Sequence, residues 1–213
     1  TARNPGKPIW LPVFGWFAHA PFMSVAVFPY PETVRPLFFS FHLNKPDDLR
    51  PDYLAYLKHF APIGCRDRST RDWLMNQGID AFLSGCVTTT LALPNIDAEP
   101  RAKIYDIETP PHLAPAGAVR IAHMFPEVKE RSFEANLADA LRLLRMYASA
   151  EAISTSRLHC YLPSRALGTK AAFHPLNATD RRYDGLTDLD DAAFTQMRSR
   201  LTNLLDQMLG LIF

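Results

Sequence analysis

Short apolar runs recur along the whole chain, and most have the length of a buried strand. They lie at residues 8–17, 36–43, 61–65, 79–84, 102–107, 118–123, 151–155 and 169–174. From about residue 36 onward, segments with helical spacing separate these runs. Regular alternation of strand and helix predicts an α/β architecture with Rossmann-like, mostly parallel sheets.

The helices between the strands carry their own start and stop signals. Arg50-Pro51 opens a short helix, and a second is predicted from an N-cap at Ser69 to a C-terminal glycine at Gly78. Ser132 is the expected N-cap of the clearest amphipathic helix. A further helix is predicted over residues 156–167, and a long apolar stripe predicts another from Asp190 onward.

Proline-rich sequence around residues 93–100 suggests a boundary between two parts of the chain. We therefore expect an N-terminal α/β lobe at residues 1–95 and a C-terminal α/β lobe at residues 96–213. The chain starts at Thr1, which leaves open that the N-terminal lobe is longer in the full protein.

Charge and cysteine usage narrow the class of protein. The chain has 23 basic and 22 acidic residues, without the basic excess or stripe of a duplex-binding protein, so no nucleic-acid partner is expected. Cys65, Cys86 and Cys160 form neither a close pair nor a zinc motif, which indicates a reducing compartment and no metal. No apolar run reaches membrane-spanning length and no signal pattern is visible, so we expect a cytoplasmic protein.

Polar residues follow the strands at three places, and ligands of parallel sheets bind at the carboxyl ends of strands. The first place is residues 66–70, where Arg66 directly precedes a capped helix bearing Ser69 and Thr70. An arginine beside the free amides of a helix start suits a carboxylate or a phosphate. A surface Arg-Asp pair beside an N-cap would give the same local sequence.

The second place is residues 84–90, which combine Gly85 with a row of hydroxyls that includes Thr88. Such a loop could contact a sugar or a phosphate, or it could be a turn into another strand, since threonine favours strands. Nothing beside Cys86 would lower its pKa, so we interpret this cysteine as structural.

The third place is residues 154–159, where Ser154 or Thr155 could cap the helix that follows. Ser156, Arg157 and His159 then fall at the start of that helix, where an anion would dock. A positive helix end lowers the pKa of a histidine and a bound anion raises it, which suits His159 to acid-base work. A half-buried histidine in a helix-strand junction is the alternative.

The remaining polar residues give weaker signals. His19 follows a strand end and could join a site. Residues 181–185 are expected to form a solvated turn before the last helix, and reaching the pocket is the alternative. The other histidines are interpreted as structural: His42, His59, His112, His123 and His174.

Three segments together resemble the polysaccharide pyruvyl transferase family: IGCRDRST at 63–70, GIDAFLSGC at 78–86 and ISTSRLHCYLPSRALG at 153–168. Their order and spacing match the family, and GWFAH at 15–19 and DRRYDGL at 180–186 are similar to one of its branches. The family's longer N-terminal lobe opens with a Gly- and Asn/Asp-rich turn that is not found here. This departure implies a compact N-terminal lobe or further residues upstream.

The resemblance implies a two-lobed, GT-B-like glycosyltransferase architecture and an enzyme without a cofactor. The donor would be phosphoenolpyruvate, the acceptor a sugar or glycan, free or lipid-linked at the inner membrane surface, and the product a pyruvate ketal. It also implies that Arg66 and Arg157 bind the phosphate and the carboxylate of the donor. Leu158 would contact the donor through its backbone, and His159 would be the acid or base.

Two other functions remain open from the sequence alone. A GT-B glycosyltransferase that uses a nucleotide sugar would share the fold class. A non-catalytic glycan-binding domain would need neither Arg157 nor His159 in one pocket with Arg66. The acceptor sugar, the ketal stereochemistry and the oligomeric state carry no sequence signal.

Overall fold

The computed structural model describes residues 8–17, 29–93, 103–122, 128 and 130–212. Its contacts divide the chain into two compact units. Unit 1 consists of residues 1–87 and 180–213, and unit 2 of residues 88–179. Among the described residues, no helix combines the length and the apolarity that a membrane crossing requires.

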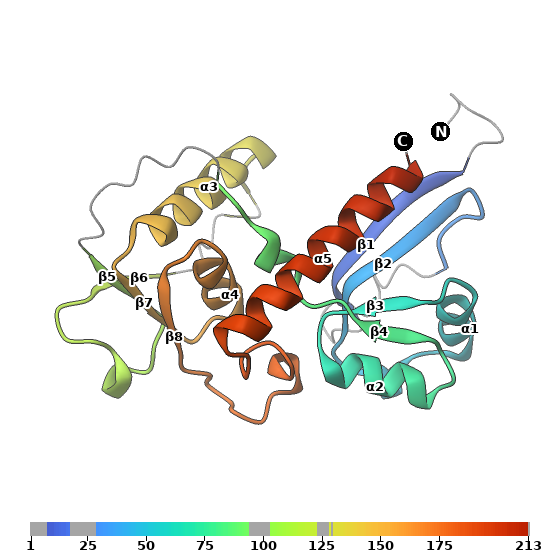
Figure 1. Ribbon diagram of the computed structural model, residues 1–213, viewed down its shortest axis with the longest axis horizontal. Coiled ribbons are helices and arrows are strands. Elements are labelled where there is room, and N and C mark those ends of the chain that lie inside the picture. Colours follow the sequence, from blue (N-terminus) through green and yellow to red (C-terminus); the bar gives the residue numbers. More distant parts are fainter. Residues whose placement is uncertain (1–7, 18–28, 94–102, 123–127, 129, 213) are drawn as a thin grey trace. The chain divides into compact units, whose positions relative to one another are not determined.

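Unit 1 is built on a parallel sheet with the strand order β1-β2-β3-β4, drawn from blue to green in Figure 1. Its strands are β1 (Ile9–Phe17), β2 (Val34–Leu43), β3 (Ile63–Cys65) and β4 (Ala81–Leu83). The helices of this unit are α1 (Pro51–His59), α2 (Arg68–Asn76) and α5 (Asp191–Ile212). Short 3-10 turns, η2 (Pro46–Asp48) and η6 (Arg181–Tyr183), complete it.

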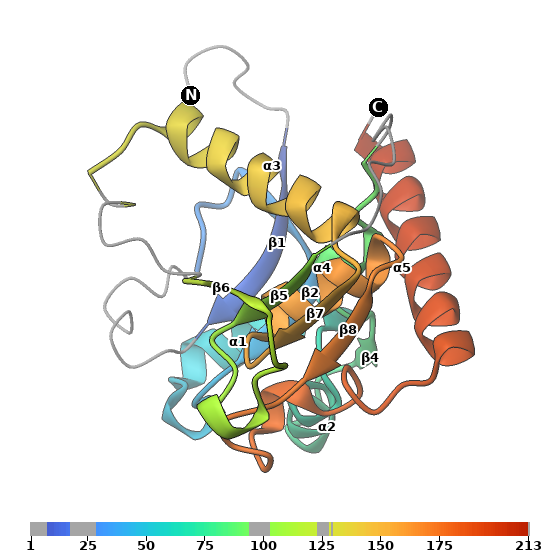
Figure 2. The ribbon, with the colours of Figure 1, turned by 90° about the vertical axis from the view of Figure 1, so that its left-hand side faces the viewer.

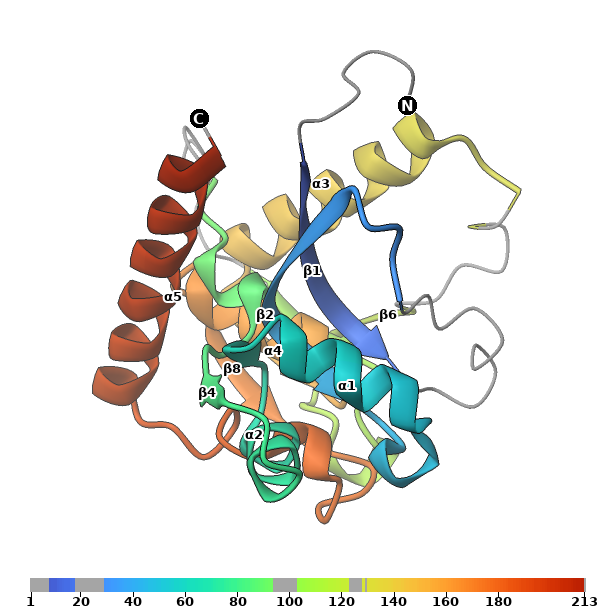
Figure 3. The ribbon, with the colours of Figure 1, turned by 90° about the vertical axis from the view of Figure 1, so that its right-hand side faces the viewer.

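Helices α1 and α2 cover the same face of this sheet (Figure 3), because each follows one strand and leads to the next in the same direction. Leu57 of α1 and Leu74 of α2 are fully buried in one cluster with Phe41 and Ile63 of the strands. At Gly64 of β3, an added Cβ would lie 2.9 Å from the Phe38 carbonyl oxygen, so β2 and β3 approach more closely than a side chain would permit.

Unit 2 is built on a second parallel sheet with the order β6-β5-β7-β8, visible in Figure 2. Its strands are β5 (Ile104–Ile107), β6 (Val119–Ile121), β7 (Ala152–Thr155) and β8 (Lys170–Phe173). Two helices, α3 (Phe133–Ser149) and α4 (Leu158–Ala166), share a face, since Tyr147 and Cys160 are buried together against Ile107 and Ile153. The 3-10 turns η3 (Val87–Thr90) and η4 (Pro111–Leu113) lie before and after β5 in the chain.

The structure confirms the predicted α/β class with parallel sheets, and every predicted strand is present with its ends shifted by at most a few residues. Ser132 caps α3 as expected, its hydroxyl accepting a hydrogen bond from the Ala135 amide. The long C-terminal helix is also present. It groups with unit 1, although the sequence placed it in a lobe at 96–213. The residues that hold it there include Met197, whose side chain lies against Gly85.

Both helix N-caps expected at the strand ends were wrong. The N-cap of α2 is Asp67 and not Ser69, because the helix begins two residues earlier and Asp67 accepts a hydrogen bond from the Thr70 amide. Neither Ser154 nor Thr155 is the N-cap of α4; that position belongs to Arg157. Two alternatives were open for the threonine run, and the structure places it in the 3-10 turn η3 and not in a turn that enters a strand.

Candidate functional site

Polar side chains gather at the carboxyl ends of the strands in each unit. In unit 1 they come from β2, β3 and β4 and from the segment that precedes α5. In unit 2 they come from β5 and β7. The two groups are described separately, as the Asp67 cluster and the Arg157 cluster.

The Asp67 cluster is centred on one fully buried carboxylate, and it comprises Asp67, His42, Arg66, Ser69 and Thr70. Oδ1 of Asp67 accepts from the Ser69 hydroxyl at 2.8 Å and from the Thr70 amide at 2.9 Å. Oδ2 lies 2.6 Å from Nδ1 of His42 and 3.4 Å from Nε of Arg66. Asp67 therefore caps the start of α2 and also fixes the side chains of His42 and Arg66.

Arg66 directly follows β3 and is only 3 % exposed. Its Nε and Nη2 make no hydrogen bond within the described part of the chain; the 3.4 Å approach to Asp67 is an ion pair that does not meet hydrogen-bond geometry. Burial is the main reason that the pKa of Arg66 is lowered, but a guanidinium remains charged. A buried cation with unused donors is an arrangement that favours an anionic ligand.

His42, at the end of β2, is 2 % exposed and faces Asp67. Burial lowers the pKa of His42, against the opposing influence of the Asp67 hydrogen bond, while the charges of Arg66 and Arg182 lower it further. The imidazole is thus neutral near pH 7, and because a carboxylate only accepts, its proton lies on Nδ1. Nε2 is then an unprotonated nitrogen, with no hydrogen-bond partner among the residues described.

Burial alone would raise the pKa of Asp67, but the hydrogen bond and the charge of His42, with Arg66 and Ser69, lower it overall. Lowered pKa values of both groups mean that the folded chain binds fewer protons than the unfolded chain. The contribution of His42 to the free energy of unfolding is therefore lost as pH falls from about 6.5 toward its folded pKa. The contribution of Asp67 is lost as pH falls below 3.8.

We expect the free energy of unfolding to fall on acidification below pH 6.5, with a slope approaching about 1.4 kcal/mol per pH unit from His42. Urea unfolding of the native chain and His42→Gln at pH 7.5, 6.5 and 5.5 measures this slope. The variant should show a flatter dependence over this interval. His59→Gln, which changes an exposed histidine of α1, should keep the native slope, and an unchanged slope in His42→Gln would contradict the assignment.

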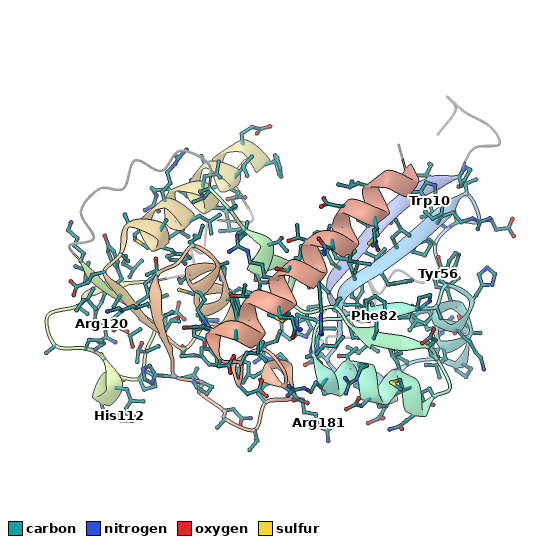
Figure 4. The ribbon with its side chains drawn as sticks, viewed as in Figure 1. Trp10, Tyr56, Phe82, His112, Arg120 and Arg181 are labelled. Carbon is teal, nitrogen blue, oxygen red and sulfur yellow. The ribbon has the colours of Figure 1, made fainter. Side chains whose placement is uncertain are left out.

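The segment before α5 lies over the start of α2. The Arg68 guanidinium contacts Asp188 at 2.6 Å and Asp184 at 3.2 Å, and the Ser69 hydroxyl donates to the Arg181 carbonyl at 3.2 Å. Arg182 stacks over Trp16, at the end of β1, with 5.2 Å to the ring centroid. The predicted solvated turn at 181–185 therefore contacts Ser69 of the Asp67 cluster, although Arg181, labelled in Figure 4, is itself exposed.

The Arg157 cluster in unit 2 joins the ends of β5 and β7, and it comprises Glu108, Ser156, Arg157, Leu158 and His159. Nε and Nη2 of Arg157 both contact Oε2 of Glu108. The Ser156 hydroxyl donates to the Glu108 carbonyl at 2.7 Å. The Arg157 side chain is 42 % exposed, so it is paired with Glu108 and yet open to solvent.

His159 is exposed near the start of α4 and departs from helical geometry, with φ −84° and ψ 15°. Pro163 lies inside α4, so no amide is available at that position for the His159 carbonyl. Leu158, the first residue of the helix, is 8 % exposed. The imidazole is thus attached to an irregular helix start. The backbone of His159 has φ and ψ values in a sparsely populated region where many active-site residues lie.

The predicted site residues fall into the two clusters with three exceptions. Gly85, with φ +87°, lies in unit 1, where an added Cβ would be 2.6 Å from Cγ of Met197. Thr88 lies in the turn η3 and groups with unit 2. His19 lies outside the described residues. Cys65 and Cys160 are buried, and burial raises the pKa of each thiol, while Cys86 is buried as well.

Sequence reasoning missed Asp67 and Glu108 and assigned His42 a merely structural role. Each of the three follows or ends a strand, so the strand-end rule that selected Arg66 could also have selected them. Within the described residues, no group of histidine, cysteine, aspartate or glutamate side chains has an arrangement suited to a metal ion.

Comparison with known proteins was then informative at the level of the family. A family model described as polysaccharide pyruvyl transferase matches residues 26–173, which include both clusters' arginines. No curated protein and no solved structure matches the chain.

Proposed function

Because the chain belongs to the polysaccharide pyruvyl transferase family, we propose that it moves a pyruvyl group from phosphoenolpyruvate to a sugar of a polysaccharide or lipid-linked glycan. Membership makes it a transferase. The donor, the acceptor and the two-lobed GT-B-like arrangement of the lobes are parts of the proposal, as is action in the cytoplasm or at the inner membrane surface.

The observation that carries the proposal is the state of Arg66. Arg66 is only 3 % exposed, and its Nε and Nη2 lack hydrogen-bond partners in the described structure. Asp67 holds it at the carboxyl end of β3, beside the start of α2. A fixed cation with unused donors and a helix N-terminus suit one anionic group of a small donor.

A further arginine proposed to bind an anionic group of the donor is Arg157, whose side chain is paired with Glu108 and partly exposed. The Leu158 backbone would contact that group, and the buried Ser156, whose hydroxyl donates to the Glu108 carbonyl, would support the site. Ser69 and Thr70 would support Arg66, while Gly85, Thr88 and His19 would contact the donor or the acceptor. No cofactor is needed for these roles.

The chemistry requires three proton movements, and a positioned imidazole can assist each of them. A proton adds to the methylene carbon of phosphoenolpyruvate, which leaves a cationic centre at C2. One sugar hydroxyl attacks C2 and gives up its proton. The C2–O bond to phosphate then breaks, inorganic phosphate leaves, and a second hydroxyl closes the ketal with loss of its proton. His159 is assigned to one of these proton transfers.

Phosphoenolpyruvate binding measured by calorimetry tests the proposal. We expect the native chain to bind in the micromolar to millimolar range, and Arg157→Ala to lose detectable binding. Arg142→Ala is the matched control, because Arg142 is an exposed arginine of α3 in the same unit. A folded native chain that binds no phosphoenolpyruvate, or that turns over a nucleotide sugar instead, would refute the proposed donor.

A further inference from the structure

Glu108 has a backbone conformation that its residue type does not favour. It follows β5 with φ +58°, in the left-handed region that glycine, asparagine and aspartate enter more readily than glutamate. Conformations of this kind are unfavourable in free energy and tend to occur at functional sites. The fold alone would be served by glycine at this position.

The backbone around Glu108 is held by groups other than its own side chain. The Thr109 amide donates to Oδ1 of the fully buried Asp106 at 3.1 Å, and Nε of Arg120 lies 2.9 Å from Oδ2 of the same carboxylate. Figure 4 labels Arg120 in this part of unit 2. On the other side, the Ser156 hydroxyl donates to the Glu108 carbonyl. These contacts hold the turn, and none of them involves the Glu108 carboxylate.

The Glu108 carboxylate contacts Arg157. Oε2 meets Nε and Nη2 of the guanidinium, which occupies one edge of the planar group. The backbone of Arg157 is fixed as well, since its amide donates to the Thr155 hydroxyl at 3.0 Å. A guanidinium held along one edge directs its remaining N–H groups, including those of Nη1, in a defined direction.

We propose that Glu108 is a positioning residue, which orients Arg157 so that the free edge of the guanidinium meets an anionic group of the donor. This inference rests on the proposed function, because it takes Arg157 as a donor ligand. The strained glutamate has a role at this turn, because its carboxylate holds the long, flexible Arg157 side chain in one orientation before the ligand binds. Preorganisation of this kind reduces the ordering that binding requires.

Three variants separate positioning from a structural role. Glu108→Gln keeps the size of the side chain and removes its charge, while Glu108→Gly removes the side chain and suits the left-handed backbone. Glu151→Gln is the matched control, because Glu151 is an exposed glutamate directly before β7. The readouts are phosphoenolpyruvate affinity by calorimetry, KM and kcat with an acceptor, and the thermal midpoint of unfolding.

We expect both Glu108 variants to lose donor affinity by about tenfold or more, because a small displacement of a binding group greatly weakens its interaction with the ligand. KM should rise more than kcat falls, and Glu108→Gly should still melt close to the native temperature. Glu151→Gln should match the native chain. Binding by Glu108→Gln that equals or exceeds native binding would overturn the proposal, because Glu108 would then compete with the donor. A loss of binding that tracks a fall in melting temperature would also overturn it.

A donor-independent signal keeps this test distinct from a test of the proposed function. The Nε–H resonance of Arg157 in ¹⁵N NMR, assigned by its loss in Arg157→Lys, should be sharp in the native chain and broadened in Glu108→Gln. If the native chain binds no phosphoenolpyruvate, the proposed donor fails, and this resonance alone decides whether Glu108 holds Arg157. An Nε–H resonance unchanged in Glu108→Gln would overturn the positioning role.

Discussion

Replacement of Asp67 by alanine is expected to lower the free energy of unfolding by about 3–5 kcal/mol, because it leaves buried charge without its partner. Asp67 is fully buried, and its two oxygens serve His42, Arg66, Ser69 and Thr70. Without the carboxylate, Arg66 loses its ion pair while it remains 3 % exposed. The Thr70 amide at the start of α2 loses its cap in the same variant.

Two further variants divide this loss into its parts. Asp67→Asn keeps one oxygen for the N-cap, removes the charge and replaces the second oxygen with an NH2 group, so Asn and Ala should differ by about 0.5–2 kcal/mol, the usual value of a cap. Arg66→Met in the Asp67→Asn background removes the stranded cation and should destabilise less than the sum of the single changes. Asp72→Asn, at an exposed position of α2, is the control and should stay within about 0.5 kcal/mol of native.

Urea unfolding at pH 7.5 provides these free energies. A loss below about 1 kcal/mol for Asp67→Ala would mean that the cluster rearranges or hydrates freely. In that event, Arg66 would be a mobile surface cation and not a fixed one. The result bears directly on the proposed donor site, since a preorganised cation binds an anion with less ordering than a mobile one.

The strands and their carboxyl ends could be predicted from the sequence because they depend on local pattern. Apolar runs such as 36–43 and 151–155 are long enough to be strands and too short to be buried helices. Arg66 and Arg157 follow such runs, so the strand-end rule located both. The family resemblance then agreed with the match over residues 26–173.

The partners of these arginines could not be predicted in the same way, because they depend on the order of strands in each sheet. Glu108 and Arg157 are 49 positions apart and meet only because β5 and β7 are neighbours. His42 reaches Asp67 because β2 pairs with β3 at Phe41 and Cys65. Local periodicity predicts that a strand exists but not which strand lies beside it.

The cap of α2 shows a different limit of sequence reasoning. Ser69 and Asp67 both have side chains that favour an N-cap, and residues 66–70 fit either register. Tertiary contacts decide between them, since Asp67 also serves the buried His42 and Arg66. The residue with more buried partners takes the cap, and Ser69 donates its hydroxyl to it.

Replacement of His159 by alanine is expected to lower kcat by about 10²–10⁴-fold and to leave donor affinity nearly unchanged, if His159 moves a proton in the transfer. The structure presents this imidazole in an exposed position, on backbone that departs from the helix at φ −84° and ψ 15°. Because the side chain is exposed, its removal should change the free energy of unfolding by no more than about 0.5 kcal/mol. A large loss of rate without a loss of stability therefore separates a chemical role from a structural one.

His112→Ala, at an exposed histidine of η4 in the same unit, is the matched control and should keep native turnover. Release of inorganic phosphate from phosphoenolpyruvate in the presence of a glycan acceptor measures the rate, and mass spectrometry of the glycan detects the ketal. If His159→Ala and His112→Ala turn over equally fast, the proton must be carried by another group. The buried His42, whose Nε2 is unprotonated, would then be the next histidine to replace.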